Sequence, residues 1–215
     1  MNIVFDLDGT LIDSAPDIQA ACNKVLADEG ARPVDMKTLI SFIGNGIPKL
    51  VERAIKARDL DIADHERLTQ KMLDYYGADP ATLSKLYNGI ETLLPALKAE
   101  HHHLGICTNK PLEPTMAILD LYGITKHFDV IIGGDTLPVK KPNPAPLVAA
   151  FKALGDGQRL YVGDSEVDAE TADKARVPFA LFTEGYRKVA VADLPKTYTF
   201  STFEDFAEVV RQHRL

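Results

Sequence analysis

The sequence predicts an α/β fold, in which a doubly wound parallel sheet (a Rossmann-like core) carries an inserted all-helical cap domain. Two observations lead to this prediction. After residue 81, short apolar runs of strand length alternate with helical patterns, and this alternation is typical of parallel sheets. Residues 14–80 instead show helical periodicity throughout and no strand-like alternation. We therefore expect a core formed by residues 1–13 and 81–215 and a cap formed by residues 14–80.

The first elements follow from apolar runs and helix-end signals. The apolar run at residues 2–6 predicts a buried strand. The first cap helix is expected to start after Ser14, as N-cap, and to stop before Gly30. Three more cap helices are expected at 36–42, 48–58 and 64–76.

The rest of the core should alternate between helices and strands. Strands are expected at 104–107, 130–132, 160–162 and 179–182, and helices at 90–99, 114–122, 145–154, 166–175 and 203–211. Phe200, Phe203 and Phe206 are spaced by three, and we expect them to form the core-facing side of the last helix. After the helix at 166–175, Arg176 stands where a left-handed cap favours glycine.

Composition and charge limit the class of protein. With 215 residues, 46% hydrophobic and 26% charged, the chain resembles an ordinary globular protein, and no stretch approaches the ~20 apolar residues of a membrane span. Its net charge of −7 disfavours nucleic acid and anionic membranes as partners, but it is compatible with a small anionic substrate. Cys22 and Cys107 lack metal-ligand spacing and are expected to be reduced thiols of a cytoplasmic protein, either a monomer or a homodimer.

Two carboxylates and a glycine end the first strand. Asp6 and Asp8 are two residues apart, so strand geometry allows both to face one side at the carboxyl end of the strand. Open α/β sheets bind their ligands at that end. Gly9 permits the sharp turn and the close backbone approach that follow. Two convergent carboxylates repel each other unless a cation, a proton or an electrophile lies between them.

Three further polar clusters follow predicted strands. They are Thr108-Asn109-Lys110, Lys140-Lys141-Pro142-Asn143-Pro144, and the segment from Gly163 to Asp168. In a parallel sheet they converge on the edge where Asp6 and Asp8 lie. Mg²⁺ prefers oxygen ligands, and a phosphoryl group needs its charged oxygens neutralised by metal, lysine and hydrogen-bond donors. The set therefore fits a site that holds Mg²⁺ and a phosphoryl group.

The carboxylates also suggest a reaction. Asp6 can attack phosphorus to form an aspartyl-phosphate, which divides hydrolysis into two steps. Asp8 can protonate the leaving oxygen and then deprotonate the attacking water. Asp164 and Asp168 are four residues apart and share one face near the metal if the helix has already begun.

This set of motifs closely resembles the haloacid dehalogenase superfamily of phosphatases over nearly the whole chain. The resemblance implies that Asp6 is the nucleophile and that Asp8 is the general acid and base, with its backbone carbonyl on Mg²⁺. It also implies that Asp164 is a metal ligand and that Asp168 supports the metal.

The same resemblance assigns the phosphoryl-binding groups. Thr108 and Asn109 would hold the phosphoryl oxygens, and a lysine would bridge nucleophile and phosphoryl group. Lys141 is preferred to Lys140, because the family's lysine directly precedes the proline of a Lys-Pro-x-Pro phrase. Relatives usually carry glycine in place of Arg176, so the end of that helix is expected to differ here.

Within the superfamily, several phrases are similar to those of phosphoglycolate phosphatases: residues 13–17, 43–46, 51–54, 132–135 and 163–165. This similarity implies hydrolysis of 2-phosphoglycolate to glycolate and phosphate. The cap loop Gly44-Asn45-Gly46 precedes a helix start, and the N–H groups there would hold the carboxylate end of the substrate. Lys49 would add positive charge, and Gly9 is expected to lie beside the substrate.

Other functions remain open at this stage. A phosphatase of another small phosphomonoester and a phosphomutase of the same superfamily would use the same aspartates. A receiver-like phospho-accepting regulatory module also places an aspartate, a hydroxyl residue and a lysine at strand ends. Asp8 and the helical insertion both argue against the receiver, which needs neither.

Overall fold

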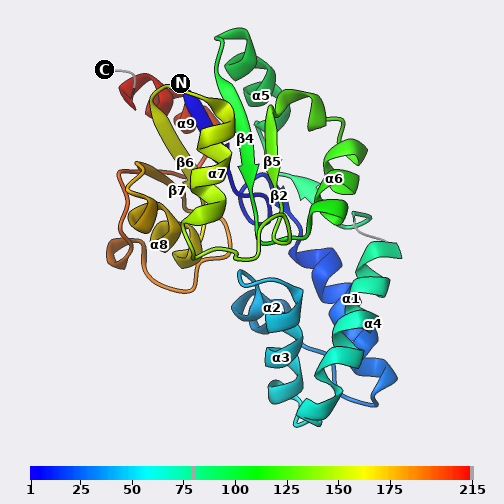
Figure 1. Cartoon of the computed structure of the whole chain (residues 1–215). Coiled ribbons are helices and arrows are strands. Elements are labelled where there is room, and N and C mark those ends of the chain that lie inside the picture. The colour runs from blue at the N-terminus through cyan, green and yellow to red at the C-terminus, as the bar shows by residue number, and fades with distance from the viewer. Residues whose placement is uncertain (79–80, 214–215) are drawn as a thin grey trace. The chain divides into compact units, whose positions relative to one another are not determined.

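The computed structural model describes residues 1–78 and 81–213 and divides the chain into two compact units (Figure 1). The first unit comprises Met1–Asp13 and Leu86–Leu215, and the second comprises Ser14–Lys85. The sequence predicted that the cap ends at residue 80, and this residue lies outside the described residues. The second unit of the structure continues to Lys85.

The first unit contains a sheet of six parallel strands in the order β5–β4–β1–β6–β7–β8. The chain builds outward from β1 in one direction and then in the other, which confirms the predicted doubly wound sheet. The strand bounds are β1 Asn2–Phe5, β4 His103–Cys107, β5 Val130–Ile132, β6 Arg159–Gly163, β7 Phe179–Phe182 and β8 Tyr198–Phe200.

Helices cover both faces of this sheet. Val4 of β1 is buried in a cluster with side chains of α7 and α8, which lie in front of the sheet in Figure 1. The next residue, Phe5, points the other way and meets Phe206 of α9 edge-on, with ring centroids 5.8 Å apart. The helices of this unit are α5 Ile90–Ala99, α6 Leu112–Leu121, α7 Ala145–Leu154, α8 Glu166–Ala175 and α9 Phe203–His213, with 3₁₀ turns η2 Thr125–His127 and η3 Val191–Asp193.

Three short strands were not predicted. β8 has three residues, and this is the strand that carries Phe200. The expectation that Phe200 belongs to the face of the last helix is therefore wrong, although Phe200, Phe203 and Phe206 are all buried. The other two, β2 (Ile12–Asp13) and β3 (Lys85–Leu86), form a separate two-stranded sheet. Each of these three strands mixes polar and apolar residues, so none contains the continuous apolar run that predicted the equally short β5.

The end of α8 also differs from expectation. Arg176 adopts the left-handed conformation, with φ 55° and ψ 46°, and its N–H donates to the Asp173 carbonyl. The helix therefore ends in the geometry that glycine favours, and the expected change of helix end does not occur.

The second unit is a bundle of helices: α1 Ala15–Asp28, α2 Met36–Phe42, α3 Ile47–Ala57, η1 Ile62–Asp64 and α4 His65–Ala78. α4 packs against both α1 and α3, and its core residues Leu68, Met72 and Tyr76 are buried. Asp17 accepts hydrogen bonds from the backbone N–H groups of Leu83 and Ser84, which fixes the two ends of the unit together. Among the described residues, no helix has both the length and the apolar character needed to cross a membrane.

Candidate active site

The ends of three neighbouring strands bring the predicted core residues together. β1 lies between β4 and β6, and Phe5 is in register with Ile106 and with Val162. Asp6 extends the ladder by one residue, because its N–H donates to the Val162 carbonyl at 2.8 Å. The residues just beyond β1, β4 and β6 therefore meet at one edge of the sheet, the edge where such folds bind ligands.

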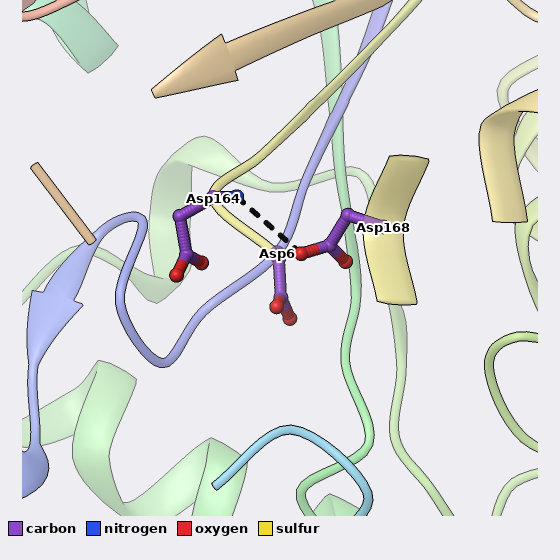
Figure 2. Close-up of side chains that lie close together, drawn as sticks. All are labelled: Asp6, Asp164 and Asp168. Carbon is purple, nitrogen blue, oxygen red and sulfur yellow. Dashed lines mark hydrogen bonds between the residues drawn. The ribbon is translucent and has the colours of Figure 1, made fainter. Parts of the chain in front are cut away.

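Three carboxylates gather at this edge. Ligand atoms of Asp6, Asp164 and Asp168 all lie within 4.8 Å of one another (Figure 2). Figure 2 also shows Asp168 turned toward the backbone of Asp164, whose N–H donates to Asp168 Oδ2 at 3.3 Å. Asp164 and Asp168 are 1% and 0% exposed, and Asp6 is 9% exposed. The cluster is thus almost entirely removed from water.

The start of α8 explains how Asp168 reaches the cluster. Ser165 is the N-cap, and the helix begins only at Glu166. The Asp168 N–H donates to Ser165 Oγ at 3.4 Å and the Ser165 N–H donates to Asp168 Oδ2 at 3.1 Å, which together form a capping box. The Ser165 hydroxyl also donates to Asp168 Oδ2, at 2.6 Å. Asp164 precedes the helix, so the condition for a shared helix face is not met, and Asp164 and Asp168 converge from the loop and the helix respectively.

Lys141 lies between two of the carboxylates. Its Nζ is 2.9 Å from Asp6 Oδ1 and 2.7 Å from Asp168 Oδ1. It also donates to the Tyr161 hydroxyl at 2.9 Å, and this hydroxyl in turn donates to Asp168 Oδ1 at 2.7 Å. Lys141 is 3% exposed, whereas its neighbour Lys140 is exposed. Of the two candidate lysines, Lys141 is the one at the site.

Neutral donors hold Asp164. The Thr10 hydroxyl donates to Oδ1 at 2.8 Å, and the Tyr186 N–H donates to Oδ2 at 2.6 Å. Gly9, with φ +85°, packs directly against this carboxylate, because a Cβ at Gly9 would stand 2.5 Å from Asp164 Oδ2. Glycine is therefore required at this turn for steric reasons as well as for its backbone conformation.

Burial and mutual repulsion shift the pKa values of these carboxylates. Burial and, to a smaller extent, the charge of Asp168 raise the pKa of Asp6 to about 7, against the lowering effect of Lys141. Burial also raises the pKa of Asp164 well above its ordinary value, with the charges of Asp168 and Asp6 adding to the rise. Burial acts on Asp168 as well, but Lys141 and hydrogen bonds from Ser165 and Tyr161 hold its pKa below the ordinary value.

The charge balance of the cluster suits a cation. Of the three buried carboxylates, Asp6 and Asp168 contact the ammonium of Lys141, and Asp164 contacts neutral donors. Ionising all three therefore leaves an excess of negative charge in a dry site. All the acidic ligand atoms are oxygens, which hard divalent cations prefer. The residues present therefore fit a bound metal ion.

Asp8 lies outside this cluster and has a lysine of its own. Lys110 Nζ is 3.0 Å from Asp8 Oδ1 and 3.3 Å from Oδ2. The neighbouring residues Thr108 and Asn109 are buried, and the Asn109 side chain donates to the Lys141 carbonyl at 3.0 Å. The segment after β4 is therefore linked both to Asp8 and to the loop that carries Lys141.

The predicted substrate-binding residues of the cap lie in the second unit. Gly44 and Gly46 have positive φ, and Gly46 is the N-cap of α3. The Asn45 carbonyl oxygen Oδ1 accepts from Arg53 at 2.8 Å. Lys49 is ion-paired with Glu52 at 2.6 Å.

Sequence reasoning missed several partners of the site: Thr10, Lys110, Tyr161, Ser165 and Tyr186. Lys110 belongs to a polar triplet after a predicted strand, so its position was a usable signal. The role of Tyr161 could not be predicted, because in the sequence it looks like one more apolar residue of a fully buried strand.

The chain as a whole can be placed in a family. Residues 3–182 match the family model described as haloacid dehalogenase-like hydrolase. This protein belongs to the haloacid dehalogenase-like hydrolases. The family's hydrolytic chemistry agrees with the acidic cluster at the strand ends.

Individual relatives are similar over nearly their full length. A phosphoglycolate phosphatase of Cereibacter sphaeroides strain ATCC 17029 is 49% identical over 212 residues, covering 98% of this chain and 97% of the relative. Another, from Rhodospirillum rubrum, is 40% identical and covers 96% and 88%. The crystal structure of a protein described as a "predicted phosphoglycolate phosphatase" from Haemophilus somnus has a TM-score of 0.91 at 32% identity, covering 97% and 96%.

Proposed function

We propose that this protein is a magnesium-dependent phosphatase that hydrolyses 2-phosphoglycolate to glycolate and phosphate through a phosphorylated Asp6. The observation that carries the proposal is the buried cluster of Asp6, Asp164 and Asp168 around Lys141. The 49% identity to a phosphoglycolate phosphatase supports the choice of substrate.

In the first step, Asp6 attacks phosphorus. A bond forms from an Asp6 oxygen to phosphorus, the bond from phosphorus to the glycolate oxygen breaks, and that oxygen takes a proton from Asp8. Lys141, 2.9 Å from Asp6, is in place to neutralise charge on the nucleophile and on the phosphoryl group. Thr108 and Asn109 supply hydrogen-bond donors for the phosphoryl oxygens.

In the second step, water releases the phosphate. The water oxygen bonds to phosphorus while the bond from Asp6 to phosphorus breaks, and the water proton passes to Asp8. Asp6 is thereby free again, and Asp8 carries the proton that the next leaving group needs. One ester and one water give one alcohol and one phosphate.

We propose that Asp6, Asp164 and the backbone carbonyl of Asp8 hold Mg²⁺. When bound, the ion supplies positive charge that offsets both the buried carboxylates and the phosphoryl oxygens. Asp168 acts in support, because its two oxygens already accept hydrogen bonds from Lys141, Tyr161 and Ser165.

The second unit is proposed to be the cap that recognises the carboxylate of the substrate. Gly44 and Gly46 both have positive φ and directly precede α3, whose first backbone N–H groups would donate to the anion. Asn45 Oδ1 accepts a hydrogen bond from Arg53. The side-chain NH₂ of Asn45 points away from Arg53 and serves as a hydrogen-bond donor. Lys49 contributes less than its charge suggests, because Glu52 already neutralises it.

We also propose that the protein is cytoplasmic and acts as a monomer or a homodimer. Cys22 and Cys107 are both buried free thiols, and burial raises the pKa of each to about 11 and about 12. Such thiols are inert and agree with a reducing compartment.

Phosphate release from a panel of small phosphomonoesters tests the proposed function. With Mg²⁺, we expect 2-phosphoglycolate to give the highest kcat/KM and p-nitrophenyl phosphate to be turned over steadily, as a receiver-like module would not do. EDTA should stop turnover and added Mg²⁺ should restore it. Absence of turnover on every ester, or full activity in EDTA, would contradict the proposal.

A further inference from the structure

Asp8 and Lys110 form an ion pair beside the acidic cluster. The ammonium faces both carboxylate oxygens, at 3.0 and 3.3 Å. The Lys110 side chain is only 3% exposed, whereas that of Asp8 is 17% exposed. The lysine is thus buried behind a carboxylate that still reaches the surface of the site.

The backbone of Lys110 is held in place from two sides. Its N–H donates to Thr108 Oγ1 at 3.2 Å, and its carbonyl accepts from the Gly134 N–H at 2.7 Å. A Cβ at Gly134 would collide with the backbone of Asn109, so the two loops pack without a gap. The backbone from which the Lys110 side chain extends is therefore held in one position.

A gain in stability does not account for this arrangement. Ordering a long lysine side chain costs rotamer entropy, and desolvating a buried ion pair commonly cancels its attraction. An apolar residue would fill the same space without the cost of desolvating a charge. What the ammonium adds is a fixed position and a compensating charge for Asp8.

We infer that Lys110 is a positioning residue, which holds the Asp8 carboxylate where it exchanges a proton with the leaving oxygen. The inference rests on the proposed role of Asp8 as the acid and base. When Asp8 passes its proton to the leaving oxygen, it gains the negative charge that the ammonium of Lys110 faces. Lys110 thus stabilises Asp8 during the proton transfer, while Lys141 serves Asp6.

If Lys110 acts through Asp8, the loss of kcat/KM on replacing Lys110 should depend on the leaving group of the substrate. Phenyl phosphate and p-nitrophenyl phosphate have nearly the same shape, but phenolate is the poorer leaving group and needs the proton more. The parameter kcat/KM reports the steps up to the first irreversible one, departure of the leaving group. We expect Lys110→Met to lower kcat/KM about 100-fold for phenyl phosphate and less than about tenfold for p-nitrophenyl phosphate.

Two further variants control for charge and for folding. Lys110→Arg keeps the cation and should retain kcat/KM for phenyl phosphate within about tenfold of wild type. Lys98→Met removes another lysine–aspartate pair of the same unit, with Asp129, and should leave both substrates unaffected. If Lys110→Met does not fold, Lys110→Gln provides the same comparison with a neutral donor.

A double-mutant cycle with Asp8→Asn completes the test. If Lys110 acts through Asp8, adding Lys110→Met to Asp8→Asn should cost less than about threefold more activity on phenyl phosphate. Equal losses on the two esters, or fully additive losses in the cycle, would overturn the inference. A wild-type protein that hydrolyses neither ester with Mg²⁺ would instead contradict the proposed function itself.

Discussion

At the scale of single residues, each of the two aspartates after β1 has its own ammonium. Asp6 lies in the dry cluster beside Lys141, and Asp8 faces Lys110 at the rim. Burying Asp6 among other carboxylates costs stability, because desolvation and Asp168 both oppose its ionisation. Function and stability therefore conflict at Asp6.

The raised pKa of Asp6 predicts how stability varies with pH in EDTA. The folded protein binds the Asp6 proton more tightly than the unfolded chain does, so the free energy of unfolding falls as pH rises from 3.8 through about 7. Asp6→Asn removes this contribution. We expect its stability advantage over wild type to be on the order of 2 kcal/mol greater near pH 8 than near pH 5.

Urea unfolding of wild type and Asp6→Asn at the two pH values measures the stability advantage of the variant. At the higher pH this advantage should shrink when Mg²⁺ is added to wild type. A stability difference that does not change with pH would show that Asp6 is ionised without cost in the metal-free protein.

At the scale of elements, α8 shows how one helix serves both stability and the site. Its first turn places Asp168 in a capping box with Ser165, which orients the carboxylate that holds Lys141. Its last residue is followed by Arg176 in the left-handed conformation, where a side chain costs roughly 1–2 kcal/mol. The helix is thus well capped at the site and strained at the far end.

Arg176→Gly should therefore stabilise the protein by about 0.5–1 kcal/mol, since relief of strain exceeds the extra entropy of glycine in the unfolded chain. The corresponding rise in Tm is about 2 °C, measured by thermal unfolding. Lys174→Gly, within the same helix, is the control and should lower stability by about 1 kcal/mol. A fall in Tm for Arg176→Gly would mean that the Arg176 side chain contributes contacts worth more than the strain.

At the scale of the whole molecule, the main elements could be predicted because they carry periodic signals. Met36–Phe42, Ile90–Ala99 and Glu166–Ala175 are helices with the predicted bounds. The strand at Tyr198–Phe200 could not be predicted, because Thr199 interrupts it and leaves no continuous apolar run like that of Val130–Ile132.

Part of the candidate site was also accessible from sequence. Strand-end motifs led to Asp6 and Asp164, and the family resemblance selected Lys141 over Lys140. The fold brings the three together at the edge where the parallel strands end. Tyr186 could not be found in this way. Tyr186 contacts Asp164 through its backbone N–H, and almost any residue type can supply that group, so the sequence does not reveal the contact.

The division into two units predicts that substrate selection and chemistry can be separated by mutation. Gly46→Ala introduces a Cβ where φ is +84°, at the N-cap of α3 in the proposed carboxylate-binding loop. We expect kcat/KM to fall at least about tenfold more for 2-phosphoglycolate than for p-nitrophenyl phosphate, which has no carboxylate.

Gly30→Ala provides the control, because this glycine has φ +67° and lies in the same unit at the end of α1. Its backbone strain is comparable, so its effect should be equal on the two substrates. If Gly46→Ala lowers kcat/KM equally for 2-phosphoglycolate and p-nitrophenyl phosphate, the loop has only a structural role.

The central claim is that Asp6 carries the phosphoryl group during turnover. The direct measurement is to quench the enzyme while it is turning over 2-phosphoglycolate with Mg²⁺, reduce any acyl phosphate with borohydride, and locate the product by peptide mass spectrometry. We predict that Asp6 is converted to homoserine, and that Asp8 and Asp164 are unchanged. Rapid turnover with no reduced aspartate, or with the modification on another residue, would contradict the account.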